Sequence, residues 1–187
     1  MHKHFKLYKP FGYLSQFVNN QTRRKNKKLL GELYDFPDKT MAIGRLDEKS
    51  EGLLLLTTDG KVSDLITSQK FDKEYYVQLD GIITDDAIAK LQNGIHIGIH
   101  GKKYKTKKCE VRILQDLPVF EERSRKIRDE RHGPTSWISI TLREGKFRQV
   151  RKMTSAVGFP TLRLIRVRIG HILLDNLKIG SVSPIEL

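Results

Sequence analysis

The sequence is poor in the residues that form disulfides and metal sites. Cys109 is its one cysteine, so no disulfide can form within the chain. The six histidines are scattered, and no set of cysteines and histidines has the spacing of a zinc site. We therefore expect no metal and no cofactor. Cys109 is interpreted as a small apolar residue of a strand rather than a reactive thiol.

Long hydrophobic segments are also missing. The longest purely aliphatic run is the four leucines from Leu53 to Leu56, whereas a membrane-spanning helix needs about 20 apolar residues. The N-terminus, M-H-K-H-F-K-L-Y-K-P, lacks the apolar core of a signal peptide, and no basic amphipathic helix of membrane-binding length is evident. We expect a cytoplasmic protein with no membrane partner.

Acidic residues are few relative to basic ones. The chain has 22 Asp and Glu against 35 Lys and Arg, which gives a net charge of +13 and a pI near 9.8. Such a balance favours a polyanionic partner, of which nucleic acid is the leading candidate. A length of 187 residues allows one domain with a real core, or two small lobes that share a sheet.

The pattern of apolar residues predicts an α+β fold with a mixed or mostly antiparallel central sheet. Strands are expected within 5–18 (broken near Pro10 and Gly12) and at 41–43, 53–56, 75–79, 95–100, 103–114, 137–142 and 161–169, with one or two more beyond. Helical patterns cover 29–36, 61–68, 84–92 and 146–157. The last helix is expected to bury Phe147, Val150, Thr154 and Val157. Alternation breaks at Leu164-Ile165, so that strand carries a bulge or is covered on both faces.

One carboxylate stands out in the stretch from Ile43 to Gly60. Asp47 lies in a short connection between the strand at 41–43 and the leucine run, which reads as a strand buried on both faces. Arg45 is two residues before it, so the two side chains can face the same way in extended backbone. From these residues alone, Asp47 is either a chemical group or a turn residue that bonds nearby N–H groups.

The whole string G-R-L-D-E-K-S-E-G-L-L-L-L-T-T-D-G resembles the signature of the RsuA/RluB/RluE/RluF family of rRNA pseudouridine synthases. A second string, E-G-K-F-R-Q-V-R-K-M followed by L-I-R-V-R-I-G, resembles the C-terminal signature of that family. The elements K-P-F-G and K-E-Y-Y-V are similar to two further family motifs. P-T-S-W-I-S-I-T-L and V-G-F-P-T-L-R-L-I-R favour the RluE branch, which modifies large-subunit (23S) rRNA.

The resemblance implies a pseudouridine synthase catalytic fold, with two subdomains around a cleft. Many members carry an S4-type RNA-binding domain in front of the catalytic domain. Here K-P-F-G begins at Lys9, so residues 1–187 are expected to form a single catalytic domain without it. The resemblance also implies that Asp47 is the essential carboxylate, Arg151 its cationic partner and Tyr75 the active-site aromatic. Taken alone, Arg151 fits a solvated helix face and Tyr75 a core aromatic.

Further residues are expected to contact RNA. Arg45 is expected to fill the space that the target base leaves, and Leu164 to form an apolar wall of the uracil pocket. The other expected contacts are basic: Arg148 and Lys152 beside Arg151, Arg166 on the strand at 161–169, and Arg23 and Arg24 in the polar segment 19–28. That segment is more typical of a solvated mobile loop, and the two interpretations can hold together. The charged segment 115–134 is interpreted as an RNA-facing loop.

The sequence thus predicts an enzyme that isomerises a uridine of large-subunit rRNA, as a monomer and without a small-molecule cofactor. Whether Asp47 acts as a nucleophile or as a base stays open. The alternative is a non-catalytic rRNA-binding or ribosome-assembly protein on the same fold, although such a protein has no need of Asp47, Tyr75 and Arg151 together. A metal-dependent nuclease would need clustered acidic ligands, and we expect no such cluster around Asp47.

Overall fold

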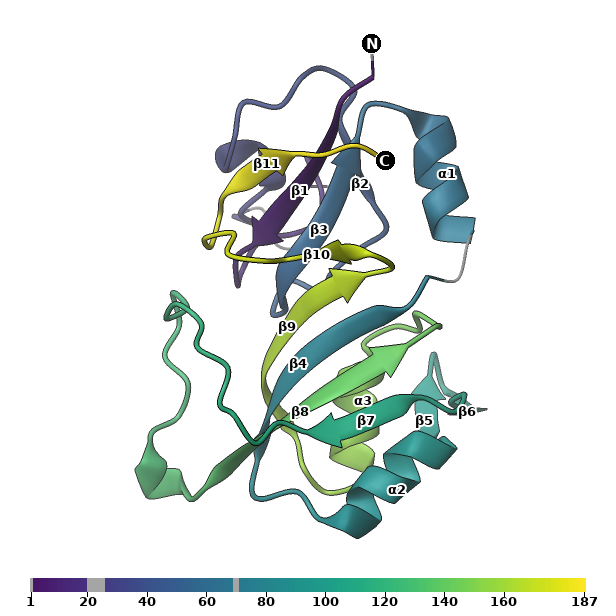
Figure 1. Cartoon of the computed structure of the whole chain (residues 1–187), viewed down its shortest axis with the longest axis vertical. Coiled ribbons are helices and arrows are strands. Elements are labelled where there is room, and N and C mark those ends of the chain that lie inside the picture. The colour runs from purple at the N-terminus through teal and green to yellow at the C-terminus, as the bar shows by residue number, and fades with distance from the viewer. Residues whose placement is uncertain (1, 20–25, 69–70) are drawn as a thin grey trace. The chain divides into compact units, whose positions relative to one another are not determined.

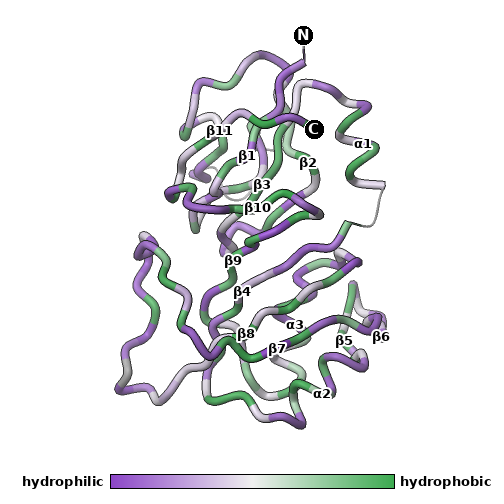
Figure 2. The backbone as a smooth tube through the Cα atoms, viewed as in Figure 1, coloured by the Kyte–Doolittle hydropathy of each residue, from purple (hydrophilic) through white to green (hydrophobic). Residues whose placement is uncertain are grey.

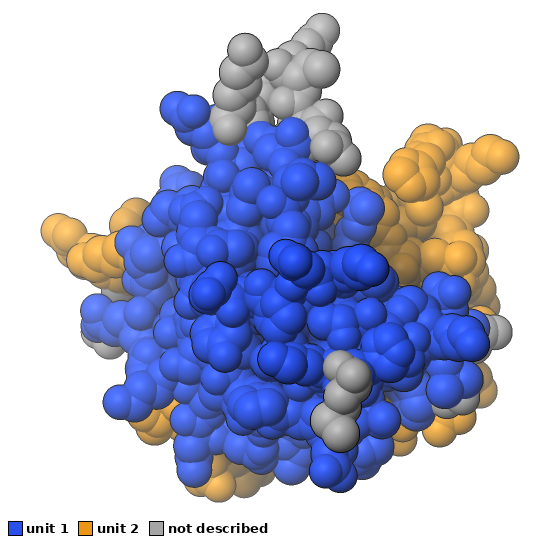
Figure 3. All heavy atoms as spheres, turned by 90° about the horizontal axis from the view of Figure 1, so that it is seen from above, with its two compact units in different colours: residues 1–71, 121–125, 166–187 blue, residues 72–120, 126–165 orange. Residues whose placement is uncertain are grey.

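The computed structural model describes residues 2–19, 26–68 and 71–187. The chain divides into two compact units (Figure 3). Unit 1 comprises Met1–Phe71, Glu121–Arg125 and Arg166–Leu187, and unit 2 comprises Asp72–Phe120 and Lys126–Ile165. Strands and helices are mixed along the chain (Figure 1), which confirms the α+β class. No helix among the described residues is long and apolar enough to cross a membrane.

Unit 1 is built on an antiparallel pair of strands. β1 (His4–Lys9) pairs with β3 (Glu51–Thr57), in the register that joins His4 to Thr57 and Lys9 to Gly52. β11 (Val182–Pro184) pairs with β1, and β2 (Met41–Ile43) pairs with β3. The other elements are the 3-10 turn η1 (Leu30–Glu32), α1 (Gly60–Ser68) and β10 (Ile172–Leu173).

Burial explains why β3 forms the middle of unit 1. All seven of its residues are buried, which confirms the expectation that the leucine run is covered on both faces. The leucines are coloured as hydrophobic in Figure 2. A cluster of apolar residues packs on one side of them: Phe5, Leu7, Leu30, Leu54 and Leu56, with Phe17 and Phe36 against it. The segment 29–36 contributes only the single turn η1 rather than a longer helix.

Unit 2 is also organised around antiparallel strands. β8 (Thr135–Leu142) pairs with β4 (Lys73–Asp80) on one side and with β7 (Glu110–Ile113) on the other. A separate hairpin joins β5 (His96–Ile99) to β6 (Lys102–Lys105). The helices are α2 (Asp85–Asn93) and α3 (Gln149–Ala156), and η2 (Glu130–His132) is a short turn. The core includes Val77, Leu79, Leu91, Ile138, Ile140 and Met153.

β9 (Thr161–Ile169) has the predicted bounds and contributes residues to both units, which divide between Ile165 and Arg166. Four consecutive residues, 163–166, are buried. This confirms the alternative in which the strand is covered on both faces. Alternation alone would have exposed every second one of these residues.

Local hydrogen bonds correct two predicted elements. The expected strand 103–114 is two strands, because Thr106 bonds to Ile95: its hydroxyl accepts from the Ile95 N–H at 2.9 Å, and its own N–H donates to the Ile95 carbonyl at 2.9 Å. The expected helix 146–157 begins only at Gln149, because Arg148 takes a left-handed conformation with φ 52°. Phe147 therefore precedes the helix and is 55% exposed, so its expected burial was wrong. Met153 and Gln149 are buried in addition to Val150 and Thr154.

Candidate active site

Asp47 lies in unit 1, in the connection 44–50 between β2 and β3. Its side chain is half-buried, and its carbonyl accepts from the Ser50 N–H at 2.9 Å. The preceding residue, Leu46, is fixed by Ser15: the Ser15 hydroxyl donates to the Leu46 carbonyl at 2.7 Å and lies 3.0 Å from the Leu46 N–H. Ser15 is itself buried. The backbone immediately before Asp47 is thus held by a buried side chain of a distant segment.

Glu48, the residue after Asp47, is held through both its carbonyl and its carboxylate. The Glu48 carbonyl accepts from the Gly12 N–H at 2.7 Å and from the Lys9 ammonium at 3.4 Å. The Glu48 carboxylate receives the Lys27 ammonium at 2.6 and 2.8 Å. Both sides of Asp47 are therefore tied to the segments that follow β1, and this ordering suits a group that must act at a fixed place.

Lys9 is a fully buried cation next to this connection. Its ammonium donates to the carbonyls of Pro10 at 2.9 Å and Tyr13 at 2.7 Å, besides that of Glu48. Burial lowers the pKa of Lys9 from 10.5 to about 7; Glu51 opposes this most strongly, Arg166 adds to the lowering, and Asp47 and Glu48 favour the charged form. Glu51 is buried as completely as Lys9. A buried group of charges thus lies under the Asp47 connection.

Arg166 completes that group from β9. Its Nε donates to the Leu53 carbonyl at 2.7 Å, and its Nη1 donates to the Arg45 carbonyl at 3.4 Å. These two carbonyls flank Asp47 in the sequence. The Arg166 guanidinium therefore donates hydrogen bonds to the backbone on both sides of Asp47. Arg166 is only 3% exposed. The structure therefore places it in the interior, whereas the sequence predicted a contact with RNA, and its contacts support a positioning role.

One further candidate of unit 1 falls within the described residues. Arg45 is exposed, as expected for a side chain that meets RNA. Arg23 and Arg24 lie outside the described residues. Lys28, in the same basic segment, has its ammonium 5.4 Å from the centroid of the Tyr13 ring.

Unit 2 carries the other candidates. Tyr75 is half-buried on β4, opposite Ile140 of β8, and packs against the core. Arg151 is half-buried on α3, and Arg148 is half-buried immediately before this helix. Lys152 donates to the Gly98 carbonyl at 2.7 Å. Leu164 is 4% exposed and belongs to the hydrophobic core of unit 2.

The structure therefore groups the candidates by unit. Among the described candidates, unit 1 holds Asp47 with Arg45 and Arg166, and unit 2 holds Tyr75 and Arg151 with Arg148, Lys152 and Leu164. The pairing of Asp47 with Arg151 and Tyr75 stays a prediction, as does a cleft. No cluster of three or more potential metal ligands occurs within 2–19, 26–68 and 71–187.

Sequence reasoning assigned no role to Lys9 or Glu51, although a signal for Lys9 was present. Phe5, Leu7 and Lys9 alternate along β1, and the first two are core residues. A lysine in the third position of such an alternation is predicted to lie on the buried face.

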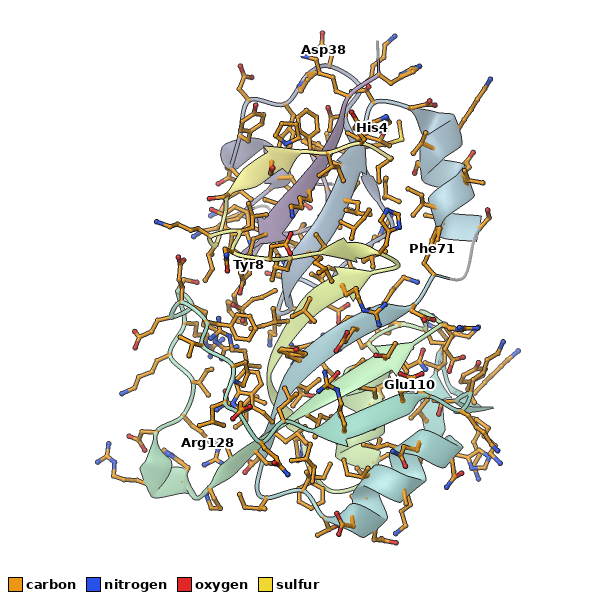
Figure 4. All side chains as sticks on the ribbon, in the orientation of Figure 1. His4, Tyr8, Asp38, Phe71, Glu110 and Arg128 are labelled. Atoms are coloured by element: carbon orange, nitrogen blue, oxygen red, sulfur yellow. The ribbon has the colours of Figure 1, made fainter. Side chains whose placement is uncertain are left out.

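The segment 115–134 is fixed at its end. Arg128, labelled in Figure 4, donates to the Asp80 carboxylate at 2.5 Å and to the carbonyls of Gly133 at 3.0 Å and Pro134 at 3.1 Å. Phe120 lies 6.2 Å from both the Tyr76 and Trp137 rings. These contacts anchor the loop to β4 and β8. That the loop faces RNA stays a prediction.

Comparison with known proteins agrees with the two signatures. Residues 3–156 match the family described as RNA pseudouridylate synthase. The chain is 39% identical over 181 residues to ribosomal large subunit pseudouridine synthase E of Vibrio parahaemolyticus, covering 96% of this chain and 72% of that protein. It is 39% identical over 173 residues to the protein of the same name from Xanthomonas axonopodis, covering 91% and 87%. A crystal structure of a pseudouridylate synthase shares the fold, with a TM-score of 0.78 and 29% identity over 100% of this chain and 71% of that one.

Proposed function

The chain belongs to the RNA pseudouridylate synthase family, and we propose that it converts a uridine of large-subunit ribosomal RNA to pseudouridine. One observation carries this proposal: nearly the whole chain is 39% identical to proteins named for the large-subunit reaction. The net charge of +13 agrees with an RNA substrate.

The reaction rearranges bonds within one nucleotide. The N1–C1′ glycosidic bond breaks, the uracil turns, and C5 joins C1′; the C5 proton leaves and N1 takes a proton. No electron or phosphoryl group is transferred, so the chain needs to supply only a fixed carboxylate, a place for the base and proton transfer.

We assign the carboxylate to Asp47, either as the nucleophile or as the base at the ribose. Both roles need a carboxylate at a fixed place. The hydrogen bonds that Lys9, Ser15 and Arg166 donate to the neighbouring backbone support such a placement. Arg151 is assigned as its cationic partner. Tyr75 is assigned as a flat face for the uracil, with a hydroxyl that assists removal of the C5 proton.

The target base must leave its stack before it reaches Asp47, which costs a few kcal/mol. We assign Arg45 to the vacated space, because it is exposed and only two residues from Asp47. Leu164 is assigned to the apolar wall of the uracil pocket, and Arg148 and Lys152 to phosphate contacts.

The test is release of tritium from large-subunit rRNA labelled at uracil C5, with wild type and Asp47→Asn side by side. Wild type is expected to release tritium and Asp47→Asn to release none, while RNA affinity and melting temperature change little, because Asn keeps the shape of the half-buried Asp. A large loss of stability in Asp47→Asn would instead favour a turn residue. Tight binding without release, from this rRNA, small-subunit rRNA and immature ribosomal particles alike, would favour the non-catalytic assembly protein.

Two further properties belong to the proposal. The relatives are bacterial proteins that act on ribosomal RNA by name, and bacterial ribosomes are assembled in the cytoplasm, so we place the reaction there. We expect a monomer, which light scattering at assay concentration tests.

A further inference from the structure

The hairpin β5–β6 concentrates positive charge in a segment that holds none of the residues assigned to catalysis. Between Gly94 and Cys109 the sequence has five lysines and no acidic residue: Lys102, Lys103, Lys105, Lys107 and Lys108. All five are exposed. Hydrophilic colouring marks β6 in Figure 2. None of the residues expected from the sequence to contact RNA lies in this segment.

The hairpin has a buried and an exposed face. Ile97 and Ile99 of β5, with Tyr104 of β6, pack against the core of unit 2. In the same ladder Gly98 pairs with Lys103 and His96 pairs with Lys105, and these residues alternate with the packed ones. The apolar face therefore docks the hairpin, and the other face presents the two lysines to solvent.

An exposed aromatic stack lies at the turn of this hairpin. The rings of His100 and Phe147 are 5.8 Å apart with an interplanar angle of 24°. The Lys152 ammonium is 5.0 Å from the Phe147 ring centroid and also bonds the Gly98 carbonyl. Phe147 is 55% exposed, and His100 is exposed as well. Lys152 thus joins the start of α3 to β5, and the two rings sit where hairpin and helix meet.

A network behind the stack keeps this corner rigid. The Tyr104 hydroxyl donates to the Glu144 carboxylate, which also accepts from the Lys107 N–H at 2.8 Å and the Gln149 amide at 2.6 Å. The Lys146 ammonium lies 5.0 Å from the Tyr104 ring. The Glu144 carboxylate accepts all three of these hydrogen bonds, so its negative charge stabilises the network.

We propose that the β5–β6 hairpin, together with the start of α3, forms an RNA-binding surface, which holds phosphates with lysines and stacks a base on the His100–Phe147 pair. Exposed aromatics beside lysines suit single-stranded RNA, because every base offers a flat face and every nucleotide a phosphate. An acidic protein would use the lysines but would gain nothing from the ring stack. The inference rests on the proposed function, which makes RNA the partner.

The test is the affinity of the full chain for fluorescein-labelled oligouridylate of about twelve nucleotides, measured by anisotropy across a salt series. Replacing Lys102, Lys103, Lys105 and Lys108 by Gln is expected to weaken binding about tenfold or more. It should also lower the slope of log K against log salt by about 3, since each single-strand phosphate contact contributes about 0.7. The matched control replaces four exposed lysines of unit 1, Lys3, Lys39, Lys61 and Lys178, and is expected to change the slope by less than about 1.

Two ring variants test the stack. Phe147→Ala is expected to weaken binding about tenfold, whereas Phe147→Trp keeps the affinity and shows fluorescence quenching when RNA binds. Equal losses in the hairpin and control lysine variants, an unchanged affinity of Phe147→Ala, or equal competition by polyglutamate would each overturn the proposal.

The binding assay separates this inference from the proposed function, because it needs no turnover. If tritium is released by the wild type, the hairpin variant is expected to raise KM with kcat unchanged. If no tritium is released, a selective loss of oligouridylate binding still supports the RNA surface.

Discussion

Lys9 occupies a core position of β1 and is charged only at a free-energy cost. Its folded-state pKa is about 7, against 10.5 for an ordinary lysine. Between these two values the unfolded chain holds a proton that the folded chain lacks. The folded state is therefore penalised at pH 7 and below, and the penalty is relieved as pH rises toward 10.5.

Comparison of wild type with Lys9→Met checks this titration. The free energy of unfolding of wild type is expected to rise relative to that of the variant by up to about 1.4 kcal/mol per pH unit above pH 7. Urea unfolding at pH 7, 8 and 9 measures it. Titrating groups that do not interact with Lys9 are common to both proteins and cancel in the difference. A difference that is flat with pH would show that folded Lys9 keeps an ordinary pKa.

Arg166 shows why some site residues escape sequence reasoning. Its neighbours in T-L-R-L-I-R-V-R-I indicate a strand with a basic stripe, from which a contact with RNA was expected. In the structure its guanidinium reaches carbonyls that are distant in sequence, those of Leu53 and Arg45. No local pattern encodes such a contact. The signature around Asp47 was readable because its residues are consecutive.

Arg166→Lys is expected to lower kcat for tritium release by about tenfold to a hundredfold, with KM within about threefold. Lysine keeps the charge but lacks the planar fork that bonds two separated carbonyls. Arg168→Lys, the same change two positions along β9, is the control and is expected to leave kcat near wild type. Equal losses in both variants, or a lower melting temperature with normal kcat, would contradict the positioning role.

At the scale of elements, the turn that follows α2 depends on Gly94. Its φ is 88°, and a Cβ there would lie 2.3 Å from the Thr106 carbonyl oxygen. That oxygen belongs to main chain, which is held by the bonds between Thr106 and Ile95. Gly94 thus lies closest to Thr106, the residue that separates β6 from β7.

Gly94→Ala is expected to destabilise the chain by about 2 kcal/mol or more, from backbone strain and the close contact together. The control is Gly98→Ala on β5, where a Cβ meets no atom within 4 Å. We expect the control to cost less than about 1 kcal/mol. Urea unfolding of both variants measures the difference, and equal losses would contradict the role of the close approach.

Elements with strong periodicity were predicted well. β9 has its predicted bounds, α2 begins after Thr84, whose hydroxyl accepts from the Ala87 N–H at 3.3 Å, and β3 is buried throughout. The errors in the predicted bounds arise from conformations that depend on the tertiary structure. The left-handed Arg148 delays α3, and Thr106 ends β6, yet neither residue type signals this conformation in the sequence.

At the scale of the whole molecule, the charge of +13 makes RNA affinity depend on salt. The basic residues of 19–28 are not all expected to contribute to this salt dependence. Lys27 is committed to the Glu48 carboxylate, beside Asp47. Its replacement is expected to disturb the site, so it is a poor probe of phosphate binding.

The sharper probe of this segment is replacement of Arg23, Arg24 and Lys25 by Gln with Lys27 kept. If all three contact phosphates, the slope of log K against log salt falls by about 2, because each contact contributes about 0.7 on single-stranded RNA. Anisotropy titrations with large-subunit rRNA fragments between 0.05 and about 0.2 M salt measure the slope. Since Lys27 and Glu48 are untouched, kcat at saturating RNA is expected to stay at the wild-type value. An unchanged slope would remove these three residues from the interface and leave the hairpin lysines as the main phosphate contacts beyond the active site.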